Sequence, residues 1–320
     1  MMVFFFARVI MSEQSPPIAV FAFNRPDHLR RTLEALSENI GAAGSSVTVF
    51  CDGPRSDRDV AACSQVRRVA EERRGFRSVE VVERDRNLGC AASVIDGVDR
   101  MLLMDDRVVV IEDDIHTAPG TLEYFWRALD EYAGTPSVFS IAAWAPPFSV
   151  VPSDYPYSAY FFPRFHCWGW ATWRNRWNWN DWSVPGYEDY VTNAFLRGAH
   201  AAGGNDLAAM LEAQRRRQID SWAVRAEYTR FMRGCVTLYP RQPLALNIGM
   251  DGSGRHCGTS TKYGSSLSGM ASPDPKAFPK HICVDATIAN RFRRIYRPPG
   301  LATRIVSRIT REIRKLSGAS

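Results

Sequence analysis

The chain has 320 residues, of which 45% are hydrophobic and 23% charged, a composition typical of a globular protein with a sizeable core. Its formal net charge is +6, and the excess lies in residues 291–315, which hold nine basic side chains against one acid, Glu312. Because the rest is close to neutral, we expect no broad basic face and no nucleic-acid partner. No run of about 18 apolar residues is present, so no segment is predicted to span a membrane.

The seven cysteines are odd in number, widely scattered and never spaced as C-x-x-C. This pattern favours reduced thiols in a cytoplasmic protein over a disulfide framework or a structural zinc site. We interpret residues 1–17 as an apolar N-terminal extension. It is either a membrane-contacting segment or an upstream start, with Met11 as the true first residue.

Residues 18–145 repeat one pattern, in which a short β-branched run is followed by a helical stretch. The runs lie at 18–23, 47–51, 79–83 and 107–111, and helices are predicted to about residue 39, over 57–74 and after residue 89. Such alternation predicts an α/β fold, a mostly parallel Rossmann-like sheet with helices on both faces. We interpret this part as the first half of the folded chain.

Polar residues follow three of the four predicted strands. Ligands of parallel sheets bind outside the carboxyl ends of the strands, and polar residues there are candidates for one site. They are Asn24 and Arg25 after the first run, Asp52 after the second, and Asp113 and Asp114 after the fourth.

Three acids, Glu112, Asp113 and Asp114, come directly after the fourth run. Carboxylate oxygens suit a hard divalent cation such as Mg²⁺ or Mn²⁺. If the strand continued through them, Glu112 and Asp114 would share a face and Asp113 would not, so we do not expect all three to bind a metal ion. The structural alternative is an acidic turn that caps the segment containing Pro119.

These acids belong to a set of motifs in a fixed order. The set is FAFNRPDHLRR (21–31), CDGPR (51–55), NLG (87–89), VVVIEDDIHTAPG (108–120), DSWAVR (220–225) and NIGMDGSGRHC (247–257). Together they resemble glycosyltransferases of the GT-A fold, most closely the group that contains N-acetylglucosaminyltransferase I and its bacterial family-2-like relatives. The resemblance covers roughly residues 18–258 and implies that residues 18–145 are the nucleotide-sugar-binding half.

The resemblance implies transfer of a sugar from a nucleotide-diphosphate sugar, in the first place a UDP-sugar, to a hydroxyl of a glycan or lipid-linked acceptor. It assigns Asp114 to the cation, Mn²⁺ or Mg²⁺, which would neutralise the leaving diphosphate. The other donor-binding residues that it implies are Glu112 and Asp113 at the ribose or donor sugar, Asp52 at the base, and Asn24 and Arg25 at the nucleotide. Arg255 and His256 are further candidates at the diphosphate or metal, although His256 also suits a surface loop.

An inverting transfer needs a carboxylate that takes the proton of the acceptor hydroxyl. Asp181 and Asp220 are the candidates. The resemblance favours Asp220, which directly precedes Ser221 and Trp222 ahead of the last glycine-rich loop, although the related enzymes carry two adjacent acids there. The structural alternative is that Asp220 is the N-cap of the following helix.

Residues 146–258 are the predicted acceptor-binding and catalytic half, which begins with irregular, aromatic-rich sequence. Six of the nine tryptophans lie between residues 168 and 182. The spacing of Trp170, Trp173 and Trp177 predicts one buried face of a helix. The candidates for stacking on an acceptor sugar are Trp168, Trp179, Trp182 and Trp222.

Residues 259–320 are predicted to form a linker and a basic tail. Leu301, Ile305, Ile309 and Ile313 recur every four residues among arginines, the pattern of a basic amphipathic helix that binds anionic lipid or packs on the body. We therefore expect a cytoplasmic protein, peripheral on the inner face of the cell membrane.

Two other functions remain open from the sequence. A nucleotidyltransferase-like enzyme would also combine an α/β sheet with acidic metal ligands, but the segment after the first run has no glycine-rich, lysine-containing phosphate loop. A non-catalytic module that binds glycans or nucleotide sugars at a membrane surface is the second alternative.

Overall fold

The structure is a computed structural model, which describes residues 15–252 and 278–296. The first half of the central sheet consists of β1 (Ile18–Ala22), β2 (Ser46–Cys51), β3 (Ser78–Glu83) and β4 (Arg107–Glu112). These four strands pair in parallel, in the spatial order β3-β2-β1-β4. The four strands expected from the β-branched runs are thereby confirmed.

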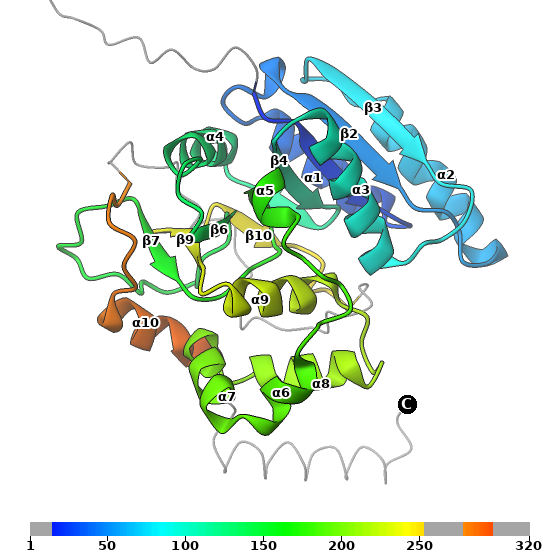
Figure 1. The fold of residues 1–320 in the computed structure, drawn as a ribbon. Helices are drawn as coiled ribbons and strands as arrows, with labels where there is room; N and C mark the ends of the chain where they lie inside the picture. The colour runs from blue at the N-terminus through cyan, green and yellow to red at the C-terminus, as the bar shows by residue number, and fades with distance from the viewer. Residues whose placement is uncertain (1–14, 253–277, 297–320) are drawn as a thin grey trace, which may run out of the picture.

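The second half of the sheet consists of β6 (Val138–Ala142), β7 (Ala159–Phe162), β8 (Trp170–Trp173) and β9 (Val236–Pro240). Strand β8 lies antiparallel between β4 and β6, while β9 runs parallel to β6 and antiparallel to β7. The eight strands thus form one mixed, mostly parallel sheet that ends at β3 and β7 (Figure 1).

Helices cover both faces of this sheet, as the alternating pattern predicts (Figure 1). One face packs against α1 (Pro26–Ser37), α2 (Asp57–Glu71) and α4 (Thr121–Glu131), and the other against α3 (Cys90–Met104) and α9 (Trp222–Met232). Pro26 at its first turn fixes the start of α1. The other helical segments are α5 (Arg174–Trp177), α6 (Tyr187–Thr192), α7 (Ala194–His200), α8 (Leu207–Arg215), α10 (Ala286–Phe292), and the 3₁₀ turns η1 (Ala42–Gly44), η2 (Ala201–Gly203) and η4 (Arg293–Tyr296).

A separate two-stranded sheet joins distant parts of the chain. Strand β5 (Ile115–Thr117), directly after the acids, pairs antiparallel with β10 (Ala245–Asn247). This pairing brings the last glycine-rich segment beside the end of β4.

The tryptophan-rich segment differs from its prediction. Trp170 and Trp173 lie at the two ends of strand β8, and Trp177 lies in the short helix α5. All three are buried, but residues three apart in a strand point to opposite faces, so they do not share one helical face. Trp173 packs with α4, while Trp170 and Trp177 pack under α9.

Residues 278–296, which the sequence divides between a linker and a basic tail, pack against the body. Phe278 joins the core on the α4 face, and Phe292 of α10 stacks on Phe162 with ring centroids 3.9 Å apart. The predicted amphipathic positions 301–316 and residues 1–14 lie outside the described residues. None of the described helices is long and apolar enough to cross a membrane. The six cysteines in the described ranges are free thiols.

Candidate active site

The predicted polar strand ends meet where the chain direction through the sheet reverses. From β1 the chain proceeds outward to β2 and β3, and then returns to β4 on the other side of β1. Such a switch point leaves a crevice outside the carboxyl ends of the two central strands, where ligands of open α/β sheets bind. In register, Glu112 of β4 lies opposite Phe21 of β1. The residues after these strands therefore lie together at the edge of the sheet where a ligand is expected.

Three acids and one arginine form what we call the acidic corner: Glu112, Asp113, Asp114 and Arg25. The Nη2 atom of Arg25 donates to Asp113 Oδ1 and, at 3.0 Å, to Asp114 Oδ2. Strand β4 ends at Glu112, so the alternation expected for a continuing strand does not reach these aspartates, and both contact the same guanidinium. Thr32 of α1 donates to the Asp113 carbonyl at 2.7 Å, which fixes this turn against the helix.

The charges of the acidic corner are only partly compensated. Burial, together with the charges of Asp114 and Asp113, raises the pKa of Glu112 to about 8 against the opposing effect of Arg25. Burial also raises the pKa of Asp113 to about 7, again opposed by Arg25. Asp114 is buried, and among the residues that the structure describes its Oδ1 has no hydrogen-bond partner. The corner can therefore accept further positive charge.

Asp52 and Asn24 organise the neighbouring loops. Buried Asp52 accepts hydrogen bonds from the backbone N–H groups of Leu88 at 2.9 Å, Gly89 at 3.1 Å and Gly53 at 3.1 Å, so it holds the turn that opens α3. Asn24 donates its side-chain amide to Asp59 of α2 at 2.8 Å and, in the part of the chain that the structure describes, forms no hydrogen bond with the acidic corner. Arg25, rather than Asn24, contacts the acids.

The segment after β10 closes one side of the acidic corner, a contact that the sequence analysis missed. The Ile248 N–H donates to the Asp114 carbonyl at 2.8 Å. A Cβ at Gly249 would lie 2.4 Å from Asp114 Oδ2 and 2.8 Å from Arg25 Nη1, so only glycine fits this backbone approach. Two residues further on, the chain contacts α1: Asp251 Oδ2 lies 3.2 Å from His28 Nε2. The sequence showed that this segment is rich in glycine, but it did not show that the segment contacts Asp114.

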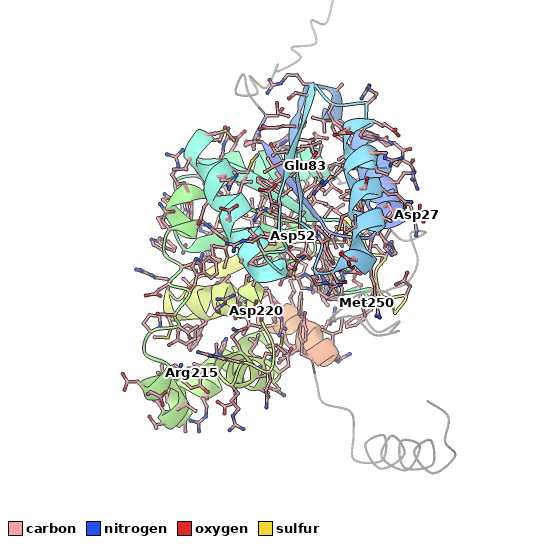
Figure 2. The ribbon with its side chains drawn as sticks, turned by 90° about the vertical axis from the view of Figure 1, so that its right-hand side faces the viewer. Asp27, Asp52, Glu83, Arg215, Asp220 and Met250 are labelled. Atoms are coloured by element: carbon pink, nitrogen blue, oxygen red, sulfur yellow. The ribbon has the colours of Figure 1, made fainter. Side chains whose placement is uncertain are left out.

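Asp220 lies just before α9 and is not part of the helix. Ser221 is the N-cap, since its Oγ accepts from the Val224 N–H at 3.3 Å, so the alternative that Asp220 caps the helix is wrong. The Asp220 side chain is 70% exposed and pairs with Arg225 at 3.2 Å. It lies below Asp52 in the view of Figure 2.

The thiol of Cys90, at the start of α3, relates Asp220 to the acidic corner. Cys90 is exposed by accessible area, but the protein around its thiol reduces its solvation and raises its pKa, and the charges of Glu112, Asp113, Asp114 and Asp220 raise it further. Asp220 and the acidic corner therefore act electrostatically on the same thiol.

The other candidates lie elsewhere. Exposed Asp181 accepts from the Ser183 N–H at 2.9 Å and from the Ser183 hydroxyl at 2.6 Å, which lower its pKa and make it part of a local turn. Trp222 is buried and cannot stack on an acceptor, whereas Trp182 is half-buried with Arg225 over its ring at 5.7 Å. Arg255 and His256 lie outside the described residues.

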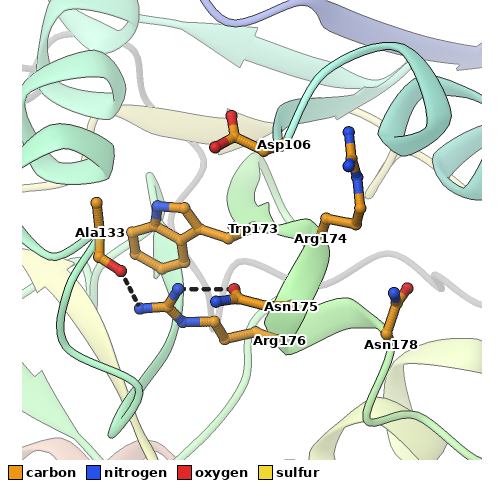
Figure 3. A pocket seen from close by; sticks show the side chains of 7 residues that line it. All are labelled: Asp106, Ala133, Trp173, Arg174, Asn175, Arg176 and Asn178. Carbon is orange, nitrogen blue, oxygen red and sulfur yellow. Dashed lines mark hydrogen bonds between the residues drawn. The ribbon is translucent and has the colours of Figure 1, made fainter.

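A cavity of about 280 Å³ lies away from the acidic corner, at the amino end of β4 (Figure 3). Asp106, which precedes this strand, lines it together with Trp173 and Arg176. The guanidinium of Arg176 is buried and donates to the carbonyls of Tyr132 at 3.0 Å and Ala133 at 2.8 Å. These bonds join α5 to the end of α4, which is a structural role.

The acidic corner has a donor set that fits a hard divalent cation. Within residues 15–252 and 278–296, no three His, Cys, Asp or Glu side chains form a complete metal-binding group. A cation held by one or two carboxylates, water and substrate phosphates does not need such a cage. The unpartnered Asp114 Oδ1 and the raised pKa values of Glu112 and Asp113, which a bound cation would lower, fit this kind of site.

No protein-family model matches this chain, and no curated protein sequence does. Solved glycosyltransferase structures are similar to it. One is the mannosyltransferase PcManGT from Pyrobaculum calidifontis in complex with GDP-Man and Mn²⁺, with 21% identity over 50% of this chain and 45% of that chain, and a TM-score of 0.35. This chain thus spans less than half the length of that enzyme.

A second similar structure is the galactosyltransferase LgtC in complex with donor and acceptor sugar analogs. It has 10% identity, covers 69% of this chain and 72% of its own, and has a TM-score of 0.36. An active-site mutant of LgtC has 13% identity and a TM-score of 0.33, covering 55% of this chain and 64% of its own. Likenesses at these scores establish neither the fold family nor the activity.

Proposed function

We propose that the protein is a metal-dependent, inverting glycosyltransferase of the GT-A fold that uses a nucleotide-diphosphate sugar. The observation that carries this proposal is the acidic corner, a buried and under-compensated group of carboxylates at the switch point of the sheet. The ordered motifs from residue 18 to residue 258 support the same activity.

The acidic corner would bind the donor diphosphate. Asp114 would hold Mn²⁺ or Mg²⁺ through its unpartnered Oδ1, and Glu112 and Asp113 would contact the ribose or the donor sugar. When bound, the cation supplies charge neutralisation to the departing diphosphate. Asp52 holds the loops after β2 and before α3 together, which suits a role beside the base of a UDP-sugar. Arg255 and His256 remain proposals for the diphosphate side.

Asp220 would act as the general base. The acceptor hydroxyl attacks the anomeric carbon, a new C–O bond forms on the opposite face from the breaking bond to the diphosphate, and the hydroxyl proton passes to Asp220. Its exposed carboxylate has room for an acceptor sugar of a glycan or lipid-linked substrate, and Trp182 lies over the neighbouring Arg225.

Nucleotide binding is the first test. In a thermal-shift panel, UDP-sugars should raise the melting temperature with Mn²⁺ present, because a ligand at 100 times its Kd stabilises by about 2.7 kcal/mol. The variant Asp114→Asn should lose the metal-dependent part of the shift. If no nucleotide diphosphate changes the melting temperature with metal, the proposal fails.

Turnover is the second test, and it separates an enzyme from a binding module. Asp220→Asn should keep the nucleotide-dependent shift but lose roughly 10²–10⁴-fold in transfer rate, the usual contribution of a general base. Asp181→Asn is the matched control and should transfer normally. A fully active Asp220→Asn enzyme would exclude this residue as the base. Pyrophosphate release instead of sugar transfer would favour a nucleotidyltransferase.

A peripheral membrane location is a further part of the proposal and rests on the sequence of residues 301–316. Because Ile295 and Tyr296 are buried in the body, a truncation that tests the tail must begin after residue 296. The truncated protein should no longer bind vesicles of anionic lipid. Unchanged binding would refute the anchor.

A further inference from the structure

Arg25 is the resident cation of the acidic corner. In the part of the chain that the structure describes, Asp113 and Asp114 form their ion pairs with this guanidinium and with no other cationic side chain. One nitrogen, Nη2, contacts both carboxylates. Arg25 therefore holds together the two aspartates that a divalent cation would otherwise neutralise.

The pairing is incomplete on both sides. Asp114 is only 6% exposed, yet within residues 15–252 and 278–296 its Oδ1 has no hydrogen-bond partner, and neither has the buried Nη1 of Arg25. Other buried atoms also lack partners, but here an acceptor and a donor without partners lie at the same corner, where one ligand can contact both. A cation would satisfy the free carboxylate oxygen, and an anion would satisfy the free guanidinium nitrogen.

On the side of β10, the backbone of Gly249 lies against the acidic corner, and a Cβ there would lie 2.4 Å from Asp114 Oδ2 and 2.8 Å from Arg25 Nη1. Among residues 15–252 and 278–296, no side chain completes the pairing of Asp114 Oδ1 and Arg25 Nη1. A bound ligand that carries both a cation and an anionic group would complete it.

We propose that Arg25 is an exchangeable counter-ion, which releases Asp113 and Asp114 to a divalent cation and moves to the diphosphate of the incoming nucleotide. This inference rests on the proposed function and adds that cation binding and nucleotide binding are coupled through Arg25. A guanidinium pairs equally well with a carboxylate or a phosphate, so the exchange conserves its interactions. Arg25 is partly exposed, with 20% of its side chain accessible, which leaves it room to move.

The exchange makes cation and nucleotide binding cooperative. A cation alone must displace Arg25 and leave the guanidinium without a partner, so it should bind weakly. A nucleoside diphosphate offers Arg25 a new partner and should raise the affinity for the cation, and the reciprocal effect on the nucleotide must be equal.

Removing the guanidinium should have effects of opposite sign on the two ligands. We would measure Mn²⁺ binding from the electron paramagnetic resonance signal of free Mn²⁺, and UDP binding by calorimetry, at one pH. Arg25→Met should bind Mn²⁺ alone at least about 5-fold more tightly than the wild type, the lower end of usual coupling factors. UDP should no longer increase the affinity of this variant for Mn²⁺. Its affinity for UDP should fall by a similar factor or more.

Two variants serve as controls. Arg30→Met removes the same charge from helix α1, which begins directly after Arg25, but Arg30 is exposed and pairs with Asp27, so both affinities should stay at wild-type values. Arg25→Lys keeps the charge as a point cation without the planar fork and should give an intermediate Mn²⁺ affinity. This variant also tests the proposal if Arg25→Met does not fold.

The outcomes separate this inference from the proposed function. If Mn²⁺ binds wild type and both Arg25 variants with equal affinity, while UDP still enhances binding, Arg25 is not a competitor and only the exchange is refuted. If wild-type protein binds UDP equally with and without a chelator, Arg25 replaces the cation permanently, and the exchange fails together with metal dependence. If neither ligand binds, the proposed function fails.

Discussion

The protein contains two buried groups of acids and arginines that differ in how completely they are paired. In the Glu227 cluster, Arg230 donates Nε and Nη2 to the two carboxylate oxygens at 2.8 Å, and Phe165 N–H and His200 add further contacts. Burial would raise the pKa of Glu227, but Arg230 and His200 hold it at about 2. In the acidic corner one arginine faces three acids, and two carboxyl pKa values are raised.

This difference separates a scaffold from a site. In the Glu227 cluster the charged groups are paired with one another inside the protein, and the cluster fixes α9 against the residues before β8. The acidic corner leaves charge and hydrogen-bonding capacity for something outside the protein. Buried ion pairs are therefore informative about function only when the partners of each oxygen and nitrogen are counted.

The largest expected effect is on the Glu227 cluster. Glu227→Gln leaves Arg230 buried without a counter-ion and should lower the free energy of unfolding by about 3–5 kcal/mol in urea denaturation. Glu188→Gln breaks the exposed pair with Arg215 and should cost less than about 1 kcal/mol. Equal losses in the two variants would contradict the contrast between the groups.

The two groups should respond to pH in opposite directions. Because the Glu112 pKa rises from 4.5 to about 8 on folding, the folded state keeps a proton that the unfolded chain has lost, and stability should fall as the pH rises through this window without metal. Each such carboxyl contributes a slope of up to about 1.4 kcal/mol per pH unit. Glu227, with its pKa lowered to about 2, instead loses its contribution below pH 4.5.

Chemical denaturation between pH 5 and 8 would measure this slope. Glu112→Gln mimics the protonated group and should flatten the curve, while Glu80→Gln, an exposed change on β3, should leave it as in the wild type. A wild-type stability that does not fall across this range would show that the acidic corner is better compensated than its contacts indicate.

The smallest effect is expected at the wall of the acidic corner. Gly249→Ala places a methyl group against Asp114 and Arg25 and should cost about 1–3 kcal/mol of overpacking, with weaker Mn²⁺ and UDP binding. Gly198→Ala is the control: it lies in α7 with nothing within 4 Å of the added carbon, and should gain about 0.5–1 kcal/mol. Unaltered ligand binding by Gly249→Ala would contradict the close approach.

The sequence predicted the half of the site that local patterns determine. Each β-branched run ends in polar residues, and parallel strands bring such ends to one edge, so Arg25, Asp113 and Asp114 could be placed together in advance. The tryptophan spacing was misread because Trp170 and Trp173 lie at the ends of a four-residue strand, too short to display its own period.

The other half depends on contacts that no local pattern encodes. Strands β5 and β10 have three residues each, and their pairing is what brings Gly249 to Asp114. Similarly, the sequence analysis offered Asp220 as a possible cap of α9, whereas in the structure the cap is the next residue, Ser221. The sequence also could not predict that the Asn24 side chain points toward Asp59 instead of the acids.

The pairing of β5 with β10 also orders events during synthesis. Strands β1 to β4 are complete once residue 112 has been made, but the wall of the acidic corner comes from residues 245–249. Chains grow from the amino terminus at about 5–20 residues per second, so strands β1 to β4 are complete at least several seconds before residues 245–249 are made. A nascent chain released before β10 would carry the acids, but not the enclosure that makes them a binding site.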